Sequence, residues 1–394
     1  MNFIIKKTLR SLDIDENPNE QAKVEFFFST YRVMWEGASI DLIKIELKIS
    51  KNLSQLFLFI KKLLSFSWEK ALEAKSKIEK LSIKEAIPTF FIERLLPVMT
   101  LKEIKLNIQY MNFYNENSFF TIRINDLTDS SRKENLLSLV IHDLSKKNIL
   151  IRYDPHIPEL IHIPVKQKSL VLKNKWYKEG YIIIQDKASA AVIHILTPRI
   201  NEFLCDMCVA PGMKASLIAY YTKNKAVVVS GEFNTNRAKL TKELFKKLSV
   251  TSNHIINTDS IIFPIRSKHQ FDRILLDAPC TGSGTFLASP ELKWRQNENF
   301  LHQNIILQKK LIKSAINLLK PNGILVYSTC SLYPEEGEYQ ILDFLDYLKP
   351  LALPEWFSPS YKIKNSILPG TGRLFPSIHQ TQGFFIGKFQ KKEP

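Results

Sequence analysis

The chain of 394 residues carries 55 Lys and Arg against 39 Asp and Glu, which gives a formal net charge of +16. Hydrophobic residues make up 45% of the chain and charged residues 24%, a balance that is typical of globular proteins and excludes a largely disordered chain. No apolar run approaches the roughly 20 residues of a membrane helix, and residues 1–10 lack a signal-peptide core, so we expect a soluble, cytoplasmic protein that is not bound to a membrane.

The first part of the chain, residues 1–85, has the spacing of helices. Apolar residues recur every three or four positions over Gln21–Trp35 and Ser54–Leu81, with Lys and Glu between them and almost no Gly. This pattern predicts a small helical domain, and Pro88 and Pro97 mark the transition that follows it.

Residues 86–185 carry shorter, mixed elements. Ser118–Ile124 alternates like a strand, Ser131–Ile141 has helical spacing, and Asn148–Tyr153 has the character of an extended segment. The combination predicts a small α/β module.

From residue 186 to residue 394, strands and amphipathic helices alternate regularly. The expected strands are Phe203–Cys205, Ala226–Ser230, His254–Asn257, Phe271–Leu276, Gly323–Tyr327 and Gly383–Phe389. The expected helices are Pro211–Tyr221, Asn236–Leu248, Glu298–Leu319 and Glu335–Leu345, with a turn at Pro321–Gly323. Apolar strands between amphipathic helices predict an α/β fold with a mainly parallel sheet, whose ligands bind at the carboxyl ends of the strands.

Acidic residues and a Pro-Gly turn follow the first three of these strands. The segment Asp206–Lys214 turns into a helix and exposes backbone N–H groups, but it lacks the G-x-G-x-x-G of a pyrophosphate site. Glu232 follows the second strand and Asp259 follows the third. Together they favour an adenosine ligand without phosphates, such as S-adenosylmethionine, although each one alone is as typical of a helix cap.

Two of the four cysteines follow neighbouring strands. Cys280 ends an Asp-Ala-Pro-Cys sequence after the fourth strand, and Cys330 ends a Thr-Cys pair after the fifth. A free Cys is usually a small buried apolar residue, yet two of them at the ligand edge of adjacent strands favour catalysis. Cys205 and Cys208 form a single C-x-x-C, a weak signal for a zinc or redox site because a structural zinc needs four ligands. We expect no bound metal.

These motifs resemble those of the Sun/Fmu (RsmB/Nop-type) family of S-adenosylmethionine-dependent RNA cytosine-C5 methyltransferases. The resemblance runs from about Pro88 to the C-terminus and rests on Arg123–Asn125, Gly180–Ser189, Asp206–Lys214, Asp277–Cys280, Thr329–Cys330, Arg373–Pro376 and Gly383–Phe385. It implies a Rossmann-like class I methyltransferase domain over residues 186–394, with a mainly parallel sheet and a C-terminal antiparallel hairpin. Met213, Ala215 and Gly337 depart from the residues that are usual in the family.

The resemblance also implies roles for individual residues. Cys330 is expected to add to C6 of cytosine and so make C5 nucleophilic, Cys280 to serve release of the product, and Asp277 to stabilise charge near N3. The residues expected to bind S-adenosylmethionine are Cys208, Val209, Ala210, Pro211, Gly212, Met213, Lys214, Glu232, Arg237, Asp259 and Asp277.

RNA is the partner that the resemblance implies, and the positive charge agrees with it. Residues 1–85 fit a NusB-like RNA-binding domain or a generic helical extension, and residues 86–185 fit an RRM-like RNA-binding module. A NusB-like domain would favour ribosomal over transfer RNA. The stretch from about 150 to 185 favours it too, because it is too short to hold an inserted tRNA-binding domain. Lys293–Arg295 joins two cations to an aromatic ring that could face a nucleotide.

Three alternatives differ from this interpretation in their sequence or their activity. Enzymes that methylate amino groups on this fold need no cysteine, and DNA cytosine-C5 methyltransferases do not call for Cys330. A non-catalytic RNA-binding or ribosome-assembly protein on a methyltransferase fold would transfer no methyl group.

Overall fold

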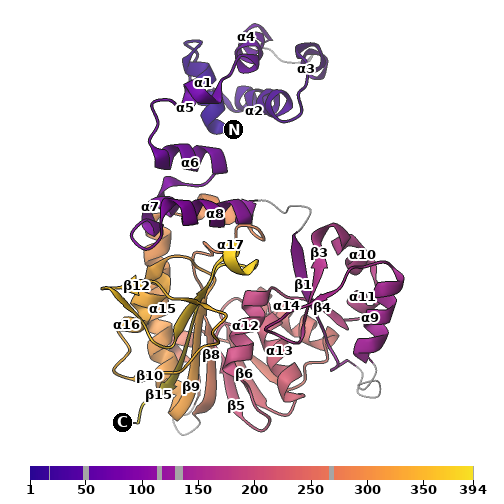
Figure 1. Ribbon diagram of the computed structural model, residues 1–394, viewed down its shortest axis with the longest axis vertical. Helices are drawn as coiled ribbons and strands as arrows, with labels where there is room; N and C mark the ends of the chain where they lie inside the picture. Colours follow the sequence, from indigo (N-terminus) through magenta and orange to yellow (C-terminus); the bar gives the residue numbers. More distant parts are fainter. Residues whose placement is uncertain (17, 48–52, 113–117, 129–135, 266–269, 394) are drawn as a thin grey trace. The chain divides into compact units, whose positions relative to one another are not determined.

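The computed structural model describes residues 1–16, 18–47, 53–112, 118–128, 136–265 and 270–393. The chain forms two compact units, Met1–Ala86 and Ile87–Pro394 (Figure 1). None of the helices in the described ranges combines the length and the apolar character that a membrane-spanning helix requires.

The first unit is built from helices. They are α1 (Asn2–Arg10), α2 (Glu20–Met34), α3 (Ile40–Glu46), α4 (Leu53–Leu64), α5 (Trp68–Leu72) and α6 (Lys77–Glu85). The predicted helix Gln21–Trp35 is confirmed as α2. The helical spacing over Ser54–Leu81 divides into three helices, because the side chains of Ser67 and Ser76 accept hydrogen bonds from the backbone N–H groups three residues on and so begin α5 and α6.

The second unit begins with two helices and a small antiparallel sheet of order β2-β3-β1-β4. Its elements are α7 (Thr89–Leu95), α8 (Leu101–Asn112), β1 (Phe119–Ile124), α9 (Leu136–Lys146), β2 (Arg152–Tyr153), β3 (Leu160–Pro164), η1 (Val165–Gln167), α10 (Lys168–Lys173), α11 (Lys175–Lys178) and β4 (Ile182–Ile184). The predicted strand Ser118–Ile124 is β1, and the predicted helix Ser131–Ile141 is α9 where it is described, residues 131–135 lying outside the described residues. The extended segment Asn148–Tyr153 is reduced to β2, because Asn148 turns the chain with a left-handed φ of 54°.

The remainder of the second unit forms a large sheet and the helices that cover it (Figure 1). Its strands are β5 (Phe203–Asp206), β6 (Val227–Glu232), β7 (Asn253–Asn257), β8 (Phe271–Asp277), β9 (Leu319–Thr329), β10 (Leu348–Pro350), β11 (Ser358–Pro359), β14 (Thr371–Leu374) and β15 (Phe384–Lys391); β12 (Lys362–Ile363) and β13 (Ser366–Ile367) form a separate pair. Its helices are α12 (Lys187–Leu196), α13 (Met213–Thr222), η2 (Ser260–Ile262), α14 (Thr235–Lys247), η3 (Pro290–Arg295), α15 (Glu298–Leu318), η4 (Pro334–Glu336), α16 (Glu338–Leu342) and α17 (Pro376–His379).

The strand order of the large sheet is β11-β14-β15-β9-β8-β5-β6-β7, with β10 paired to β15. The strands from β9 to β7 are parallel to one another, whereas β15 and β14 form an antiparallel hairpin beside β9. This arrangement confirms the predicted Rossmann-like α/β fold, with its mainly parallel sheet and C-terminal antiparallel hairpin.

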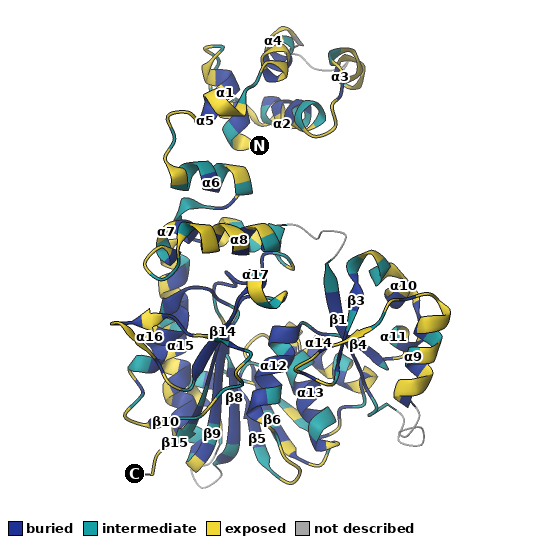
Figure 2. Cartoon of the chain, in the orientation of Figure 1, coloured by how far each residue is buried: buried dark blue, intermediate teal, exposed yellow. Residues whose placement is uncertain are grey.

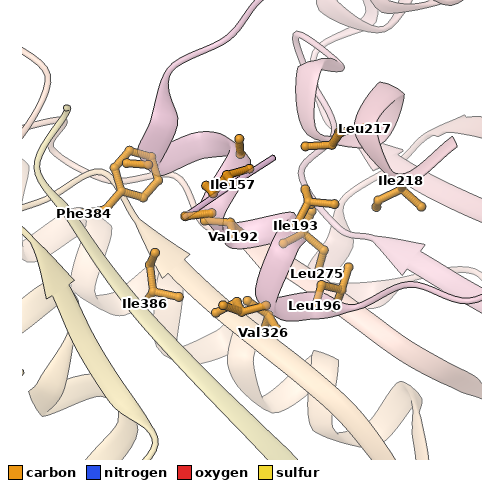
Figure 3. Close-up of a cluster of buried hydrophobic side chains, with 14 of the residues drawn as sticks. Ile157, Val192, Ile193, Leu196, Leu217, Ile218, Leu275, Val326, Phe384 and Ile386 are labelled. Carbon is orange, nitrogen blue, oxygen red and sulfur yellow. The ribbon is translucent and has the colours of Figure 1, made fainter. Parts of the chain in front are cut away.

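Alternate residues of the central strands point to opposite faces of the sheet, and each face has its own core. Leu275 of β8 and Val326 of β9 pack with Val192 of α12, and residues of α13 complete the same cluster (Figure 3). The preceding residues, Ile274 and Leu325, belong to the cluster on the other face, which α15 covers. Figure 2 shows the strands as buried ribbon and the outer helices with one exposed side.

Two predicted helices are shorter in the structure. Helix α13 begins at Met213 and not at Pro211, because Gly212 takes the left-handed φ of 98° and stands outside the helix as its N-cap. The predicted helix Glu335–Leu345 is reduced to the 3-10 turn η4 and the short helix α16. Gly337 separates them, because its φ of −127° and ψ of −98° are not helical.

Strand β9 starts earlier than predicted. It begins at Leu319 and contains Pro321–Gly323, for which we predicted a turn. Leu319 pairs with Phe271 of β8, and the next pair joins Ile324 to Arg273. The intervening residues of β9 therefore bulge out of the ladder, so the Pro-Asn-Gly sequence bends the strand without ending it.

Candidate active site

The loop between β5 and α13 borders a cavity of about 200 Å³ at the carboxyl edge of the parallel strands. The backbone N–H of Val209 donates to Gly231 O at 3.0 Å and ties this loop to β6. The cavity is lined by Ile184, Gln185, Asp186, Ser189, Asp206, Cys208, Val209, Ala210, Pro211, Met213, Lys214, Asp277 and Gln382. Of the predicted cofactor residues, Gly212, Glu232, Arg237 and Asp259 are not part of this lining.

Asp206 is the buried acid of the cavity, and sequence reasoning did not place it among the binding residues. It is 1% exposed, and its Oδ1 accepts the backbone N–H of Cys208 at 3.3 Å. Its Oδ2 has no hydrogen-bond partner among the described groups. Burial, followed by repulsion from the Asp277 carboxylate, raises the pKa of Asp206 to about 7. A cationic or hydrogen-bond-donating ligand in the cavity would satisfy this carboxylate.

The acidic residues after β6 and β7 are already engaged. Glu232 is 5% exposed and accepts the backbone N–H of Asn234 at 2.9 Å, while its Oε1 lies 3.7 Å from Nη1 of Arg237. Arg237 also donates from Nη2 to Ala210 O at 2.8 Å, so it links the cavity loop to α14. Asp259 accepts a backbone N–H two residues on and caps η2.

The two cysteines that follow β8 and β9 lie together. Asp277 and Ser328 pair across the strands, and the sulfur atoms of Cys280 and Cys330 are 3.2 Å apart. The hydrogen bond with Cys330 and burial both raise the pKa of the Cys280 thiol well above its ordinary value. The structure therefore brings together the two thiols that the sequence placed on neighbouring strands.

Asp277, three residues before Cys280, forms an ion pair with Lys214. The Asp277 Oδ2 is 2.6 Å from Lys214 Nζ, and its Oδ1 accepts the hydroxyl of Ser328 at 2.7 Å. Burial opposes the charge of Lys214, but Asp277 holds the pKa of the ammonium above its ordinary value. Lys214 thus joins the loop between β5 and α13, which we name the cofactor loop after its predicted role, to the end of β8 that precedes Cys280.

Glu336, which sequence reasoning missed, holds the Cys280 loop against the segment after Cys330. It is fully buried, and its carboxylate accepts the backbone N–H of Thr281 at 2.9 Å and the side-chain N–H of Gln308 at 3.0 Å. Burial raises the pKa of Glu336. An acidic residue in a predicted helix gave no signal of this role, because its partners are distant in sequence.

A buried ion pair fixes the same segment from the hairpin side. Arg373 on β14 and Glu338 on α16 are both fully buried, with Arg373 Nη2 2.6 Å and Nε 2.7 Å from the two carboxylate oxygens. Arg373 Nη1 also donates to Ser331 O at 3.0 Å, next to Cys330. The bidentate pair anchors the cysteine loop to the C-terminal hairpin.

The Cys280 loop also meets the hairpin through backbone alone. Gly284 donates to Cys330 O at 3.0 Å and accepts the backbone N–H of Gly383 at 2.8 Å. A Cβ at Gly284 would lie 2.1 Å from Gly383 O, so only glycine fits.

The Arg-Ile-Asn segment of β1 connects the small sheet to the large one. Arg123 is fully buried and donates to Gln185 Oε1 at 2.7 Å and to Ser216 Oγ of α13 at 2.5 Å, and burial lowers its pKa to about 10. Asn125, two residues on, donates to Leu248 O after α14 at 3.0 Å. Both side chains therefore orient the small module on the helices that border the site.

The other two cysteines and Trp294 remain to be placed. Cys205 is buried in β5 and Cys208 lines the cavity, both as free thiols. Among the described residues, no group of three or more His, Cys, Asp or Glu side chains is placed to hold a metal ion. Trp294 is 72% exposed, so it is not a core residue.

Comparison with known proteins identifies the family. The family described as 16S rRNA methyltransferase RsmB/F matches residues 193–390, half of the 394 residues of the chain. The chain belongs to the RsmB/F family. The match contains both cysteines, Asp277 and the cofactor loop.

Relatives of this RsmB/F chain include a probable ribosomal RNA small subunit methyltransferase B from Synechocystis, 32% identical over 71% of this chain and 61% of its own length. A 28S rRNA (cytosine-C(5))-methyltransferase from Mus musculus is 30% identical over 81% of this chain and 41% of its own length. The chain thus spans less than two thirds of these relatives.

Solved structures also resemble the RsmB/F chain. The crystal structure of PH0851 has a TM-score of 0.75 and 27% identity, covering 98% of this chain and 86% of that protein. A methyltransferase homologue from Pyrococcus horikoshii has a TM-score of 0.67 and 28% identity, covering 80% of this chain and 99% of that protein.

Proposed function

We propose that this chain is an S-adenosylmethionine-dependent RNA cytosine-C5 methyltransferase that acts on ribosomal RNA. The observation that carries the proposal is the 3.2 Å approach of Cys280 and Cys330 beside the Asp277–Lys214 ion pair. Direct methylation of an amino group requires neither thiol, whereas activation of cytosine C5 requires a nucleophile and a means of releasing it. The names of the relatives from Synechocystis and mouse support ribosomal RNA.

The cavity at the β5 loop fits the cofactor. Asp206 presents a buried carboxylate oxygen without a partner, which suits the ammonium group of S-adenosylmethionine. The backbone of Cys208–Met213 would border the cofactor, and Glu232 lies at the end of the neighbouring strand, where a ribose can be bound. S-adenosylmethionine supplies the methyl group.

Cys330 is the nucleophile in this proposal. Its thiolate adds to C6 of cytosine, and the electron pair of the C5–C6 bond becomes available at C5. Asp277 and Lys214 lie beside the thiols, and one of the two can hold a proton at N3 while charge develops there. After C5 has been methylated, the C5 proton passes to a water molecule, and its bonding electrons re-form the C5–C6 double bond. The bond between Cys330 and C6 then breaks, and its electron pair returns to the Cys330 sulfur.

We propose that Cys280 assists that last step. Its raised pKa favours the neutral thiol at neutral pH, and a neutral thiol can donate its proton toward the Cys330 sulfur across 3.2 Å. A sulfur that accepts a hydrogen bond is a better leaving group from C6. Cys280 therefore serves release and Cys330 addition.

The test is methyl transfer from radiolabelled S-adenosylmethionine to bulk RNA that lacks the modification. Cys330→Ala should abolish transfer, whereas Cys205→Ala, which removes a thiol on β5 away from the reacting pair, should retain it. Undiminished transfer by Cys330→Ala would overturn the assignment. No transfer by the wild-type chain to any RNA would favour the non-catalytic alternative.

RNA binding by the other modules completes the proposal. The helical unit Met1–Ala86 would serve as an RNA-binding domain of the NusB-like kind, and the β1–β4 module as an RRM-like one, both in the cytoplasm. Bisulfite sequencing of ribosomal and transfer RNA from cells with and without the gene separates the two substrates. A protein-dependent 5-methylcytosine only in transfer RNA would overturn the choice of ribosomal RNA.

A further inference from the structure

Three neighbouring cavities of the second unit, which together we call the trough, share lining residues. The cofactor cavity shares Ile184, Asp186 and Gln382 with a second cavity of about 210 Å³. The second cavity shares Phe119, Lys187 and Gln380 with a third of about 560 Å³. The trough extends from the β5 loop, past β1 and the segment around α17, to a groove beside β2 and β3. Figure 1 labels β1, β3 and α17.

The middle cavity of the trough borders the Cys280 loop at Gly284. Gly284 lines the second cavity, and its backbone N–H donates to Cys330 O at 3.0 Å. A strand of RNA whose target base reaches Cys330 can therefore continue along the trough in the direction of the third cavity.

The third cavity, which we call the stacking groove, is lined on one side by aromatic rings. The ring of His156 is stacked on that of Trp356, with centroids 4.8 Å apart and an angle of 6° between the planes. Phe357 supports Trp356 edge-on at 4.3 Å, and Lys187 Nζ lies 4.8 Å from the Trp356 ring. His156 is exposed although its ring is stacked on Trp356, so part of the residue is accessible to a ligand.

A buried ionic cluster holds this stack in place. Asp154 is 6% exposed and lies 2.7 Å from His162 Nε2 and 2.8 Å from Lys187 Nζ. Asp154 also accepts the backbone N–H groups of His156 and Ile157 at 2.8 and 2.9 Å. These bonds fix the turn that presents His156, so the ring is positioned before any ligand binds.

The charge of the groove suits a polyanion. Burial, followed by the charge of Lys187, lowers the pKa of His156, so its ring is neutral at neutral pH and stacks without carrying charge. The one carboxylate among the residues that line the groove, Asp154, is buried and paired, whereas Arg152 is exposed at the rim. Aromatic stacking surfaces beside cations are typical of sites for single-stranded nucleic acid.

We propose that the stacking groove binds a nucleotide of the single-stranded RNA substrate next to the methylated cytosine, with its base stacked on the outer face of His156 and its phosphate near Arg152. This proposal rests on the proposed function, because it is the reaction at Cys330 that places RNA in the trough. A small apolar ligand would not use the cations beside the stacked rings.

Binding of a fluorescein-labelled single-stranded RNA of about 15 nucleotides, with one central cytosine, tests the groove by fluorescence anisotropy. Because base–aromatic stacking is worth about 1–3 kcal/mol, His156→Ala and Trp356→Ala should each raise Kd about 5-fold or more. Trp356→Phe, which keeps a ring under His156, should bind nearly as wild type. Tyr347→Ala removes another exposed aromatic side chain, away from the trough, and should leave Kd unchanged.

Wild-type affinity in both His156→Ala and Trp356→Ala would overturn the proposal. If Trp356→Ala does not fold, the affinity of His156→Ala, a substitution at an exposed residue, tests the proposal by itself. Methyl transfer to the same RNA separates this proposal from the proposed function: the groove variants should raise KM with little change in kcat. If His156→Ala transfers methyl groups as well as wild type does, the proposed RNA binding in the groove is refuted, but the proposed methyltransferase activity stands. If the groove variants weaken RNA binding but the wild type transfers no methyl group, the proposed activity alone is refuted.

Discussion

Around the two cysteines, the buried charged groups have partners: Glu336 accepts hydrogen bonds from the Cys280 loop, and Arg373 forms a bidentate pair with Glu338. In the cofactor loop, by contrast, Asp206 is buried with one carboxylate oxygen unpaired. In the proposed reaction, the protein alone would hold the cysteine loops in place, whereas a ligand would complete the hydrogen bonding of the cofactor loop. Pre-organisation of reacting groups is what catalysis requires, while an unsatisfied binding group favours the ligand-bound state.

The largest effect on stability is expected when the buried ion pair beside the cysteine loops is broken. Arg373→Met leaves Glu338 buried without its partner, which should lower the free energy of unfolding by about 3–5 kcal/mol in urea. The matched control is Lys309→Ala, which breaks the exposed pair with Asp343 and should cost less than about 1 kcal/mol. Equal costs for the two variants would mean that the buried pair does not anchor the cysteine loop.

Asp206→Asn tests the effect of the unpaired carboxylate oxygen of Asp206 on stability. Because the pKa of Asp206 is raised from 3.8 to about 7, its ionised form destabilises the folded chain. That cost is absent below about pH 4, grows as the pH rises, and reaches up to about 4 kcal/mol above about pH 7. Without cofactor, the Asn variant should therefore be more stable than wild type at pH 8, with the gain shrinking toward pH 5. A pH-independent difference in urea unfolding would contradict this explanation.

A smaller effect is expected from the backbone contact between the Cys280 loop and the hairpin. Gly284→Ala forces apart two segments whose approach leaves no room for a methyl group, at a cost of about 1–3 kcal/mol. Turnover should fall more than stability, because the displaced loop carries Cys280. Thermal melting and methyl transfer measured on one preparation compare the two losses. Wild-type turnover in a folded Gly284→Ala variant would show that the loop position does not matter.

The sequence predicted the parts of the site that depend on local pattern. Continuous apolar strands and the residues just after them placed Cys280, Cys330 and Asp277 at one edge, because parallel strands present their carboxyl ends together. The Pro-Asn-Gly sequence of β9 was misjudged, since pairing with β8 resumes after it and overrides the local turn preference.

The supporting groups could not be predicted in the same way. Glu336 binds Thr281, which is 55 residues away in sequence, and Arg373 pairs with Glu338, which is 35 residues away. Neither contact therefore leaves a local pattern in the sequence. The unsatisfied oxygen of Asp206 is a property of burial and of the surrounding groups, which only the folded arrangement defines.

The most direct test of the central claim is the fate of the covalent RNA adduct when each thiol is removed. Cys280→Ala, incubated with S-adenosylmethionine and unmodified RNA, should accumulate a protein–RNA adduct that migrates slowly on a denaturing gel, because addition by Cys330 proceeds while release is blocked. The double variant Cys280→Ala/Cys330→Ala should show no such band. An adduct that persists in the double variant, or ordinary turnover without an adduct in Cys280→Ala, would contradict the division of roles between the two cysteines.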